Sequence, residues 1–130
     1  MIVVDASALL EVLLNTPAGQ RIGDRLSAAG ETLHAPHLVD LEVAQVLRRY
    51  TASGEMDAQR GLQALEDLGD LPLVRYPHDL FLSRIWDLRD NLTAYDAAYV
   101  ALAEALAAPL VTRDAALASR GAHRARVELM

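Results

Sequence analysis

Short apolar runs alternate along this chain with longer segments in which apolar residues recur at every third or fourth position. The short runs, in which β-branched residues and a bounding proline or glycine are common, predict strands at residues 2–5, 32–35, 72–76, 110–112 and 127–129. The longer segments predict helices at roughly 6–14, 18–28, 38–50, 55–68, 78–88, 94–108 and 115–119. Because strands and helices alternate throughout, we expect an α/β fold: a three-layer α/β/α sandwich around a central, mainly parallel sheet of four or five strands.

The predicted helix at 38–50 carries an acid beside its apolar face. The apolar stripe of this helix comprises Val39, Val43, Val46, Leu47 and Tyr50. At about 100° per residue, Glu42 falls at the edge of that stripe, whereas Asp40 lies on its far flank. Most such acids lean out to solvent, so Glu42 taken alone does not indicate a site.

The segment 94–108 predicts the most apolar helix of the chain. Thr93 is a candidate N-cap, and beyond the first turn Glu104 is almost the only polar position. A helix that is apolar nearly all round is normally buried. On the helix that precedes it, Leu82 and Trp86 are interpreted as core residues.

The four histidines show no spacing that would hold a metal ion. No pair stands at positions i and i+4, as in the HExxH motif, so a histidine metal site is not expected. His34 and His37, on either side of Pro36, are interpreted as surface residues.

Length and composition favour one domain that spans residues 1–130, since 130 residues with 52% hydrophobic content suffice for one core and not for two. There is no apolar run of 18 residues, so no membrane span is expected. The N-terminus lacks the basic and long apolar regions of a signal peptide. Cysteine is absent, which excludes disulfides and thiolate sites and makes a cytoplasmic protein the simplest expectation.

The formal net charge of −6 argues mildly against a nucleic-acid partner, because contacts to phosphate need basic side chains. The basic residues are, however, unevenly placed, and a short C-terminal stretch holds Arg113, Arg120, Arg124 and Arg126. All 12 basic residues are arginine, so any mechanism that needs a lysine is excluded, including that of the P-loop NTPases.

Four acids stand where a metal-dependent nuclease would need them. Asp5 and Asp114 each end a predicted strand before a helix, and N-capping is a sound alternative for both. Asp96 lies three residues after Thr93, where a capping box and the helix dipole also account for it. Ligands of open α/β sheets bind beyond the carboxyl ends of the strands. If Glu42 joins the other acids there, their repulsion calls for a cation, and oxygen ligands favour Mg²⁺ or Mn²⁺.

Taken in order, these contexts resemble the PIN-domain ribonucleases, and most closely the VapC-type toxins of bacterial toxin–antitoxin pairs. The matching segments are MIVVDASALLEVLL, LVDLEVAQVLRR and LTAYDAAYVALAEALAAPLVTRD. The third segment is the most specific, because an Asp within YDAxYVALAE followed by LVTxD is close to a family signature. Together with the short tail, these segments cover nearly the whole chain.

The resemblance implies that Mg²⁺ or Mn²⁺ is held by an acidic quartet, Asp5, Glu42, Asp96 and Asp114. It also implies that Ser7 and Thr112 are the polar residues beside that quartet. By the same resemblance the chain is an endoribonuclease toxin, restrained by a cognate antitoxin and assembled as a homodimer. Residues 115–117 are apolar where some members carry a further acid, which leaves the number of ions open.

Within this hypothesis we interpret Asp5 and Asp96 as primary metal ligands, with Glu42 and Asp114 acting through water or on a second ion. The arginines expected to grip RNA are Arg113 first, followed by Arg120, Arg124 and Arg126. For each arginine, a solvated surface position is the alternative interpretation.

Other functions fit the sequence less well. A haloacid-dehalogenase-like phosphatase needs a second Asp two residues after the first, where this chain has Ser7, and it also needs a lysine. A phosphorylatable receiver domain fails on the same missing lysine. The serious alternative is a catalytically silent PIN-like module that binds protein or RNA. All four acids are present, which favours activity over this alternative.

Overall fold

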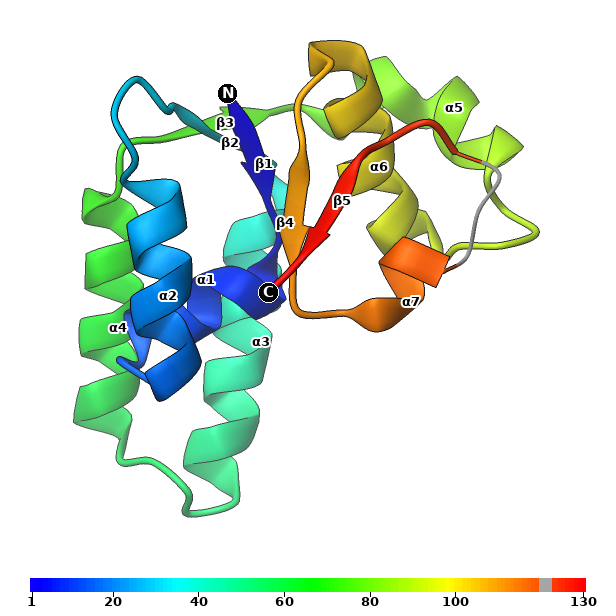
Figure 1. Cartoon of the computed structure of the whole chain (residues 1–130). Coiled ribbons are helices and arrows are strands. Elements are labelled where there is room, and N and C mark those ends of the chain that lie inside the picture. Colours follow the sequence, from blue (N-terminus) through cyan, green and yellow to red (C-terminus); the bar gives the residue numbers. More distant parts are fainter. Residues whose placement is uncertain (120–122) are drawn as a thin grey trace.

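The computed structural model describes residues 1–119 and 123–130, which form a five-stranded parallel sheet in the order β3-β2-β1-β4-β5 (Figure 1). The strands are β1 (Ile2–Val4), β2 (Leu33–Pro36), β3 (Leu73–Tyr76), β4 (Leu110–Thr112) and β5 (Val127–Leu129). The predicted parallel sheet is confirmed. The chain moves outward from β1 through β2 to β3 and then returns to the other side of β1 with β4. The carboxyl ends of β1 and β4 therefore flank the switch point where ligands of such sheets bind.

The helices are α1 (Ala6–Leu13), α2 (Pro17–Leu26), α3 (Leu38–Ala52), α4 (Ala58–Asp70), the 3-10 helix η1 (His78–Phe81), α5 (Leu82–Asp87), α6 (Ala94–Leu106) and α7 (Ala115–Ser119). Helix α6 packs on β1, β2 and β4, and η1 and α5 pack against α6. Helix α1 contacts β4 and packs against α2, α3 and α4, so that α1–α4 form a second group of helices (Figure 1). The predicted three-layer arrangement is thereby confirmed. None of the described helices is long and apolar enough to cross a membrane.

The centre of the core lies between β1 and α6. All of β1 is fully buried, as expected of a strand that is covered on both faces. Helix α6 is buried at every position from Ala97 to Ala103, so the prediction of a buried helix here is confirmed. Thr93 caps α6, since its Oγ1 accepts the backbone N–H of Asp96 at 3.2 Å. This cap fixes the start of α6 and places Asp96 in its first turn.

Helices α1 and α2 meet so closely that only glycine fits at position 19. A Cβ atom on Gly19 would lie 2.1 Å from the backbone oxygen of Glu11. Thr16 caps α2 through a hydrogen bond from the backbone N–H of Gly19, and Pro17 begins the helix. This tight joint holds α1 against α2.

The segment predicted as one helix at 78–88 is instead the 3-10 helix η1 followed by the short helix α5. The prediction that Leu82 and Trp86 belong to the core was wrong, because 56% of Leu82 and 66% of Trp86 are exposed. Helix α5 turns Leu88 into the core, which leaves the Leu82 and Trp86 side facing outward. The guanidinium of Arg89 covers the Trp86 ring at 4.7 Å.

The prediction that His34 is a surface residue was also wrong, whereas His37 is exposed as expected. His34 lies on β2, one strand in from the sheet edge, and is buried there. Its two ring nitrogens lie 2.7 Å from the Thr32 hydroxyl and 2.7 Å from the Tyr76 hydroxyl. Both nitrogens therefore have partners, which makes the burial of a polar ring tolerable.

Candidate functional site

A cleft of about 840 Å³ opens at the carboxyl ends of β1 and β4, between α1, α3 and α6. Its lining includes the four predicted acids, Asp5, Glu42, Asp96 and Asp114. Three of these acids reach the cleft because the elements that carry them begin or end at the same edge of the sheet. The structure thus brings together residues that lie more than 100 positions apart in the chain.

Asp5 lies deepest in the cleft, with 6% of its surface exposed. It caps α1, since its Oδ1 accepts the backbone N–H of Ala8 at 3.1 Å, as the capping interpretation expected. The hydroxyls of Ser7 and Thr112 donate to Oδ1 at 2.7 Å and to Oδ2 at 2.6 Å. Burial nevertheless raises the pKa of Asp5, the three hydrogen bonds oppose that shift, and the charge of Asp114 adds to it.

Ser7 and Thr112 join the two strand ends that flank the cleft. The Ser7 hydroxyl accepts the backbone N–H of Arg113 at 3.0 Å, and the Thr112 hydroxyl accepts that of Asp114 at 2.9 Å. Each hydroxyl therefore donates to Asp5 and accepts from the β4–α7 turn. The two predicted supporting residues lie beside the acids, where they fix both Asp5 and the turn that carries Asp114.

Glu42 points into the cleft and does not lean out to solvent. Its Oε1 accepts a hydrogen bond of 2.6 Å from the hydroxyl of Tyr99, a residue that is 1% exposed. Burial raises the pKa of Glu42, the Tyr99 hydrogen bond opposes the shift, and the charges of Asp5 and Asp96 add to it. Burial and the charge of Glu42 raise the pKa of Tyr99 as well, so this phenol stays protonated and acts as a donor.

The rival acid Asp40 is held away from the cleft. Both of its carboxylate oxygens accept hydrogen bonds from Arg75 of β3, at 2.8 and 2.9 Å. The prediction that Asp40 lies on the far side of the α3 stripe is therefore confirmed.

The arginines predicted to contact RNA do not all line the cleft. Arg113 lines the cleft, and its side chain reaches the Met130 backbone oxygen at 2.7 Å and Glu11 at 3.7 Å. Arg124 and Arg126 line a separate hollow near the amino-terminal ends of β4 and β5. Arg120 lies outside the described residues.

The cleft lining also contains residues to which the sequence analysis gave no role, among them Glu11, Arg49 and Tyr99. Glu11 stands four positions after Ser7, and Tyr99 stands three after Asp96, so each shares a helix face with a predicted site residue. Helical spacing could therefore have indicated both of them. Arg49 continues the Glu42 side of α3, seven positions further along.

The donor set suits a hard divalent cation, because every candidate ligand is a carboxylate or hydroxyl oxygen. Within the described part of the chain, no three acid or histidine side chains stand close enough to hold one ion together. The pKa values of Asp5 and Glu42 are both raised, so added positive charge nearby would favour the charged form of each carboxylate.

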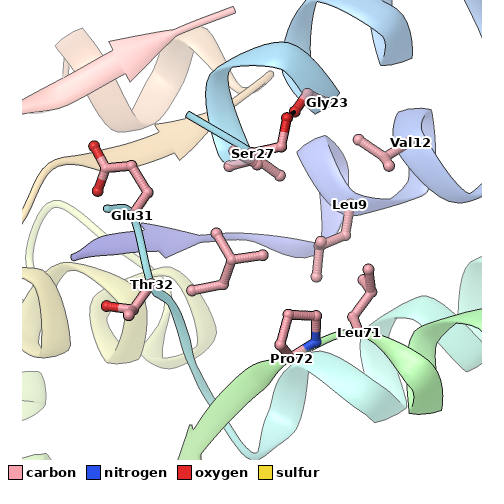
Figure 2. A pocket seen from close by; sticks show the side chains of 10 residues that line it. Leu9, Val12, Gly23, Ser27, Glu31, Thr32, Leu71 and Pro72 are labelled. Carbon is pink, nitrogen blue, oxygen red and sulfur yellow. Dashed lines mark hydrogen bonds between the residues drawn. The ribbon is translucent and has the colours of Figure 1, made fainter. Parts of the chain in front are cut away.

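A second hollow, of about 370 Å³, lies between α1, α2 and the segments that lead into β2 and β3 (Figure 2). Its walls are formed largely by aliphatic side chains, among them Leu9, Val12, Leu71 and Pro72. The one acid in the lining, Glu31, is paired with Arg25 at 3.0 Å. This hollow is therefore mainly apolar, and its acid is already paired with an arginine.

Comparisons with known proteins found a matching family model and similar sequences. The family model described as PIN domain matches residues 2–122. Ribonuclease VapC9 of Mycobacterium tuberculosis is 48% identical over 121 residues, which are 93% of this chain and 91% of that protein. Ribonuclease VapC12 of the same organism is 42% identical over 130 residues, which are 100% of this chain and 99% of that protein.

Two solved structures show the same fold. PAE2754 from Pyrobaculum aerophilum is similar with a TM-score of 0.71 and 24% identity, covering 97% of this chain and 81% of that one. VapBC2 from Rickettsia felis was solved bound to a DNA fragment from its promoter. It is similar with a TM-score of 0.71 and 15% identity, and the match covers 99% of this chain and 98% of that one.

Proposed function

Since the chain belongs to the PIN-domain family, we propose that it is a VapC-type endoribonuclease whose cleavage of RNA depends on Mg²⁺ or Mn²⁺. The single observation that carries the proposal is the one cleft that Asp5, Glu42, Asp96 and Asp114 all line. The relatives that share 42–48% of its residues over almost the full chain are VapC ribonucleases, which supports the same activity here.

Asp5 and Asp96 are the proposed direct ligands of the ion. Oδ1 of Asp5 already accepts two hydrogen bonds and Oδ2 accepts one, so Oδ2 retains a lone pair for a cation. Glu42 and Asp114 are proposed to bind through water or to hold a second ion, because Mg²⁺ seldom takes four carboxylates at once. A bound divalent ion supplies a more acidic water and a Lewis acid for the phosphate oxygens.

The residues of the chain prepare the cleft for an RNA phosphate. Ser7 and Thr112 keep Asp5 in one orientation, so that no reorganisation of this carboxylate is needed when the substrate arrives. Arg113 and Arg49 are the proposed contacts to the RNA backbone, because both line the acidic cleft. Arg124 and Arg126 line a separate hollow, so they are not proposed as contacts to the same phosphate.

We propose a cognate antitoxin as the regulatory partner, since the family members VapBC2 and a Klebsiella pneumoniae complex are toxin–antitoxin assemblies. The rim of the cleft offers two exposed apolar side chains, Leu41 (76%) and Tyr95 (65%). An apolar segment with a basic residue would complement both this rim and the acids below it. A homodimer in the cytoplasm completes the proposal, and the exposed Leu80, Leu82 and Trp86 supply apolar surface for self-association.

The deciding experiment maps cleavage of total cellular RNA by the purified protein, with Mg²⁺, with Mn²⁺ and with chelator, beside the Asp96→Asn variant. We expect discrete cuts that require a divalent ion and disappear in Asp96→Asn, because that change removes a ligand charge with little loss of volume. Cleavage that persists in chelator would refute the metal dependence. A wild-type protein that binds RNA or antitoxin but cuts no RNA with either ion would favour the catalytically silent module.

A further inference from the structure

The hydroxyl of Tyr99 lies among three of the four segments that bring acids into the cleft. It donates to Glu42 of α3 at 2.6 Å. The backbone N–H of Ala6, next to Asp5, approaches the same phenol oxygen closely enough to act on its pKa. Tyr99 itself follows Asp96 by three positions on α6, so the two share one helix face. One buried hydroxyl thus lies where α3, α6 and the β1–α1 junction meet.

Glu42 depends on this contact for its direction. It stands in the middle of α3, where it has no capping role, and a long acidic side chain in such a place ordinarily extends into water. Tyr99 gives it a short, charge-assisted hydrogen bond from a donor that is itself held in the core. The ring of Tyr99 packs in that core whatever its hydroxyl does, so the hydroxyl is a separable feature.

We propose that Tyr99 is a positioning residue for RNA cleavage, which holds the Glu42 carboxylate toward the ion-binding end of the cleft. This inference rests on the proposed function. It goes beyond the acidic quartet, because it assigns a role to a residue that binds neither ion nor RNA. The expected loss is that of a residue that orients a metal ligand, about 10- to 100-fold in metal affinity or in activity.

The test compares Tyr99→Phe with Tyr76→Phe. Each change deletes one phenol hydroxyl that forms a hydrogen bond, but the Tyr76 hydroxyl bonds to His34, away from the cleft. We expect Tyr99→Phe to lower kcat about 10- to 100-fold with KM for RNA almost unchanged, and to weaken the binding of Mn²⁺ alone in titration calorimetry by a similar factor. Tyr76→Phe should leave both quantities at wild-type values.

A second variant reaches the same contact from the other side. Glu42→Asp keeps the charge but shortens the side chain, so the carboxylate withdraws from the Tyr99 hydroxyl. Because Glu42→Asp also withdraws the carboxylate from the proposed ion, it should lose at least as much activity and Mn²⁺ affinity as Tyr99→Phe. Adding Tyr99→Phe to it should cause little further loss, since the shared contact is already broken. This variant keeps the test open if Tyr99→Phe fails to fold.

Wild-type kcat and Mn²⁺ affinity in either variant would overturn the inference, and so would fully additive losses in the double variant. A wild-type protein that cleaves no RNA with any divalent ion is a different result. It would overturn the proposed function, whereas an active wild type with an equally active Tyr99→Phe would overturn only the role of Tyr99.

Discussion

Two shielded acids at opposite ends of the sheet have opposite surroundings. Glu104, whose side chain is 7% exposed, accepts two hydrogen bonds from Arg84 and lies 3.5 Å from Arg124. Burial alone would raise the pKa of Glu104, but the arginines and the Arg124 backbone N–H lower it below its ordinary value. Asp5, 6% exposed, has only hydroxyls, one backbone N–H and other acids around it, and its pKa is raised.

This difference indicates that Glu104 stabilises the fold through its ion pairs, whereas Asp5 is available to bind a cation from outside the chain. At the Glu104 end, the chain supplies its own cations. At the Asp5 end, no arginine of the described residues forms an ion pair with Asp5, Glu42 or Asp114. A buried or half-buried carboxylate without a countercharge is costly in free energy, and positive charge from outside the chain relieves that cost.

The largest expected effect comes from Asp5→Asn. Loss of the ligand charge should reduce RNA cleavage at least about 100-fold, because the stabilisation that a metal ion gives to the transition state is worth several kcal/mol. Without divalent ions, the variant should melt at or above the wild-type temperature, because Asn also caps a helix and the repulsion is gone. Cleavage rates and thermal melts in chelator measure both effects. Wild-type cleavage by Asp5→Asn would remove Asp5 from the site.

Thr112→Val should have a smaller effect on the same end of the sheet. It deletes the donor to Asp5 and the acceptor for the backbone N–H of Asp114 while keeping the shape of the side chain. We expect cleavage to fall about 10- to 100-fold, as for other residues that orient metal ligands. Thr112→Ser, which keeps the hydroxyl, is the matched control and should restore most of the activity. Equal losses in both variants would show that packing, and not the hydroxyl, is what matters.

Glu104→Gln should have the opposite effect to Asp5→Asn: it should lower stability and leave RNA cleavage unchanged. The free energy of unfolding should fall by about 1 kcal/mol, because hydrogen bonds to charged groups are lost but both arginines remain in contact with water. Cleavage should stay at the wild-type rate, since Glu104 lies outside the acidic cleft. Urea unfolding and a cleavage assay on one preparation test both statements. A stable but inactive Glu104→Gln protein would contradict the division between the two ends.

Arg113→Ala and Arg124→Ala test which end of the sheet binds RNA, the end with the acidic cleft or the end with Glu104. Arg113 lines the cleft, so its removal should weaken binding a few-fold and reduce the salt dependence by about 0.7 in log–log slope, the value for one single-stranded phosphate contact. Arg124→Ala should leave that slope unchanged, because Arg124 lies at the other hollow. Binding to a short RNA at several salt concentrations, measured with the inactive Asp96→Asn background, gives the slopes. A larger change in slope for Arg124→Ala than for Arg113→Ala would show that RNA binds at the opposite end of the sheet.

The smallest expected effect is the change of stability with pH. We expect the free energy of unfolding to change by about 1 kcal/mol or less, which corresponds to a few degrees in melting temperature. The pKa values of Asp5 and Glu42 are raised, so without metal their protonation on acidification from neutral pH favours the folded state. The pKa of Glu104 is lowered, so its contribution is present above the ordinary value of 4.5 and is lost as the pH falls through the lowered value. Melts in chelator should therefore rise or hold on mild acidification and fall below about pH 4.5. A steady fall from neutral pH would contradict the raised pKa values.

The order of elements and the strand-end acids could be predicted from the sequence, because both depend on local patterns. Apolar runs and helical spacing identified every strand and the buried helix α6, and parallel pairing forces the carboxyl ends of neighbouring strands to one edge. The sequence therefore predicts that Asp5 and Asp114 lie at that edge. The split of 78–88 into η1 and α5 was not foreseen, since a 3-10 turn differs little from an α-helical one in its pattern.

What the tertiary structure decided is which side chains face one another across elements. Spacing along α3 left Glu42 at the edge of an apolar stripe, and only packing against α6 set the Tyr99 hydroxyl beside it. Packing likewise buried His34, exposed Trp86 and sent Arg113 and Arg124 to opposite ends of the sheet. The physical reason is that periodicity along the sequence gives only the face of a single element on which a residue lies. A contact between elements depends on strand order and on the angle at which helices pack.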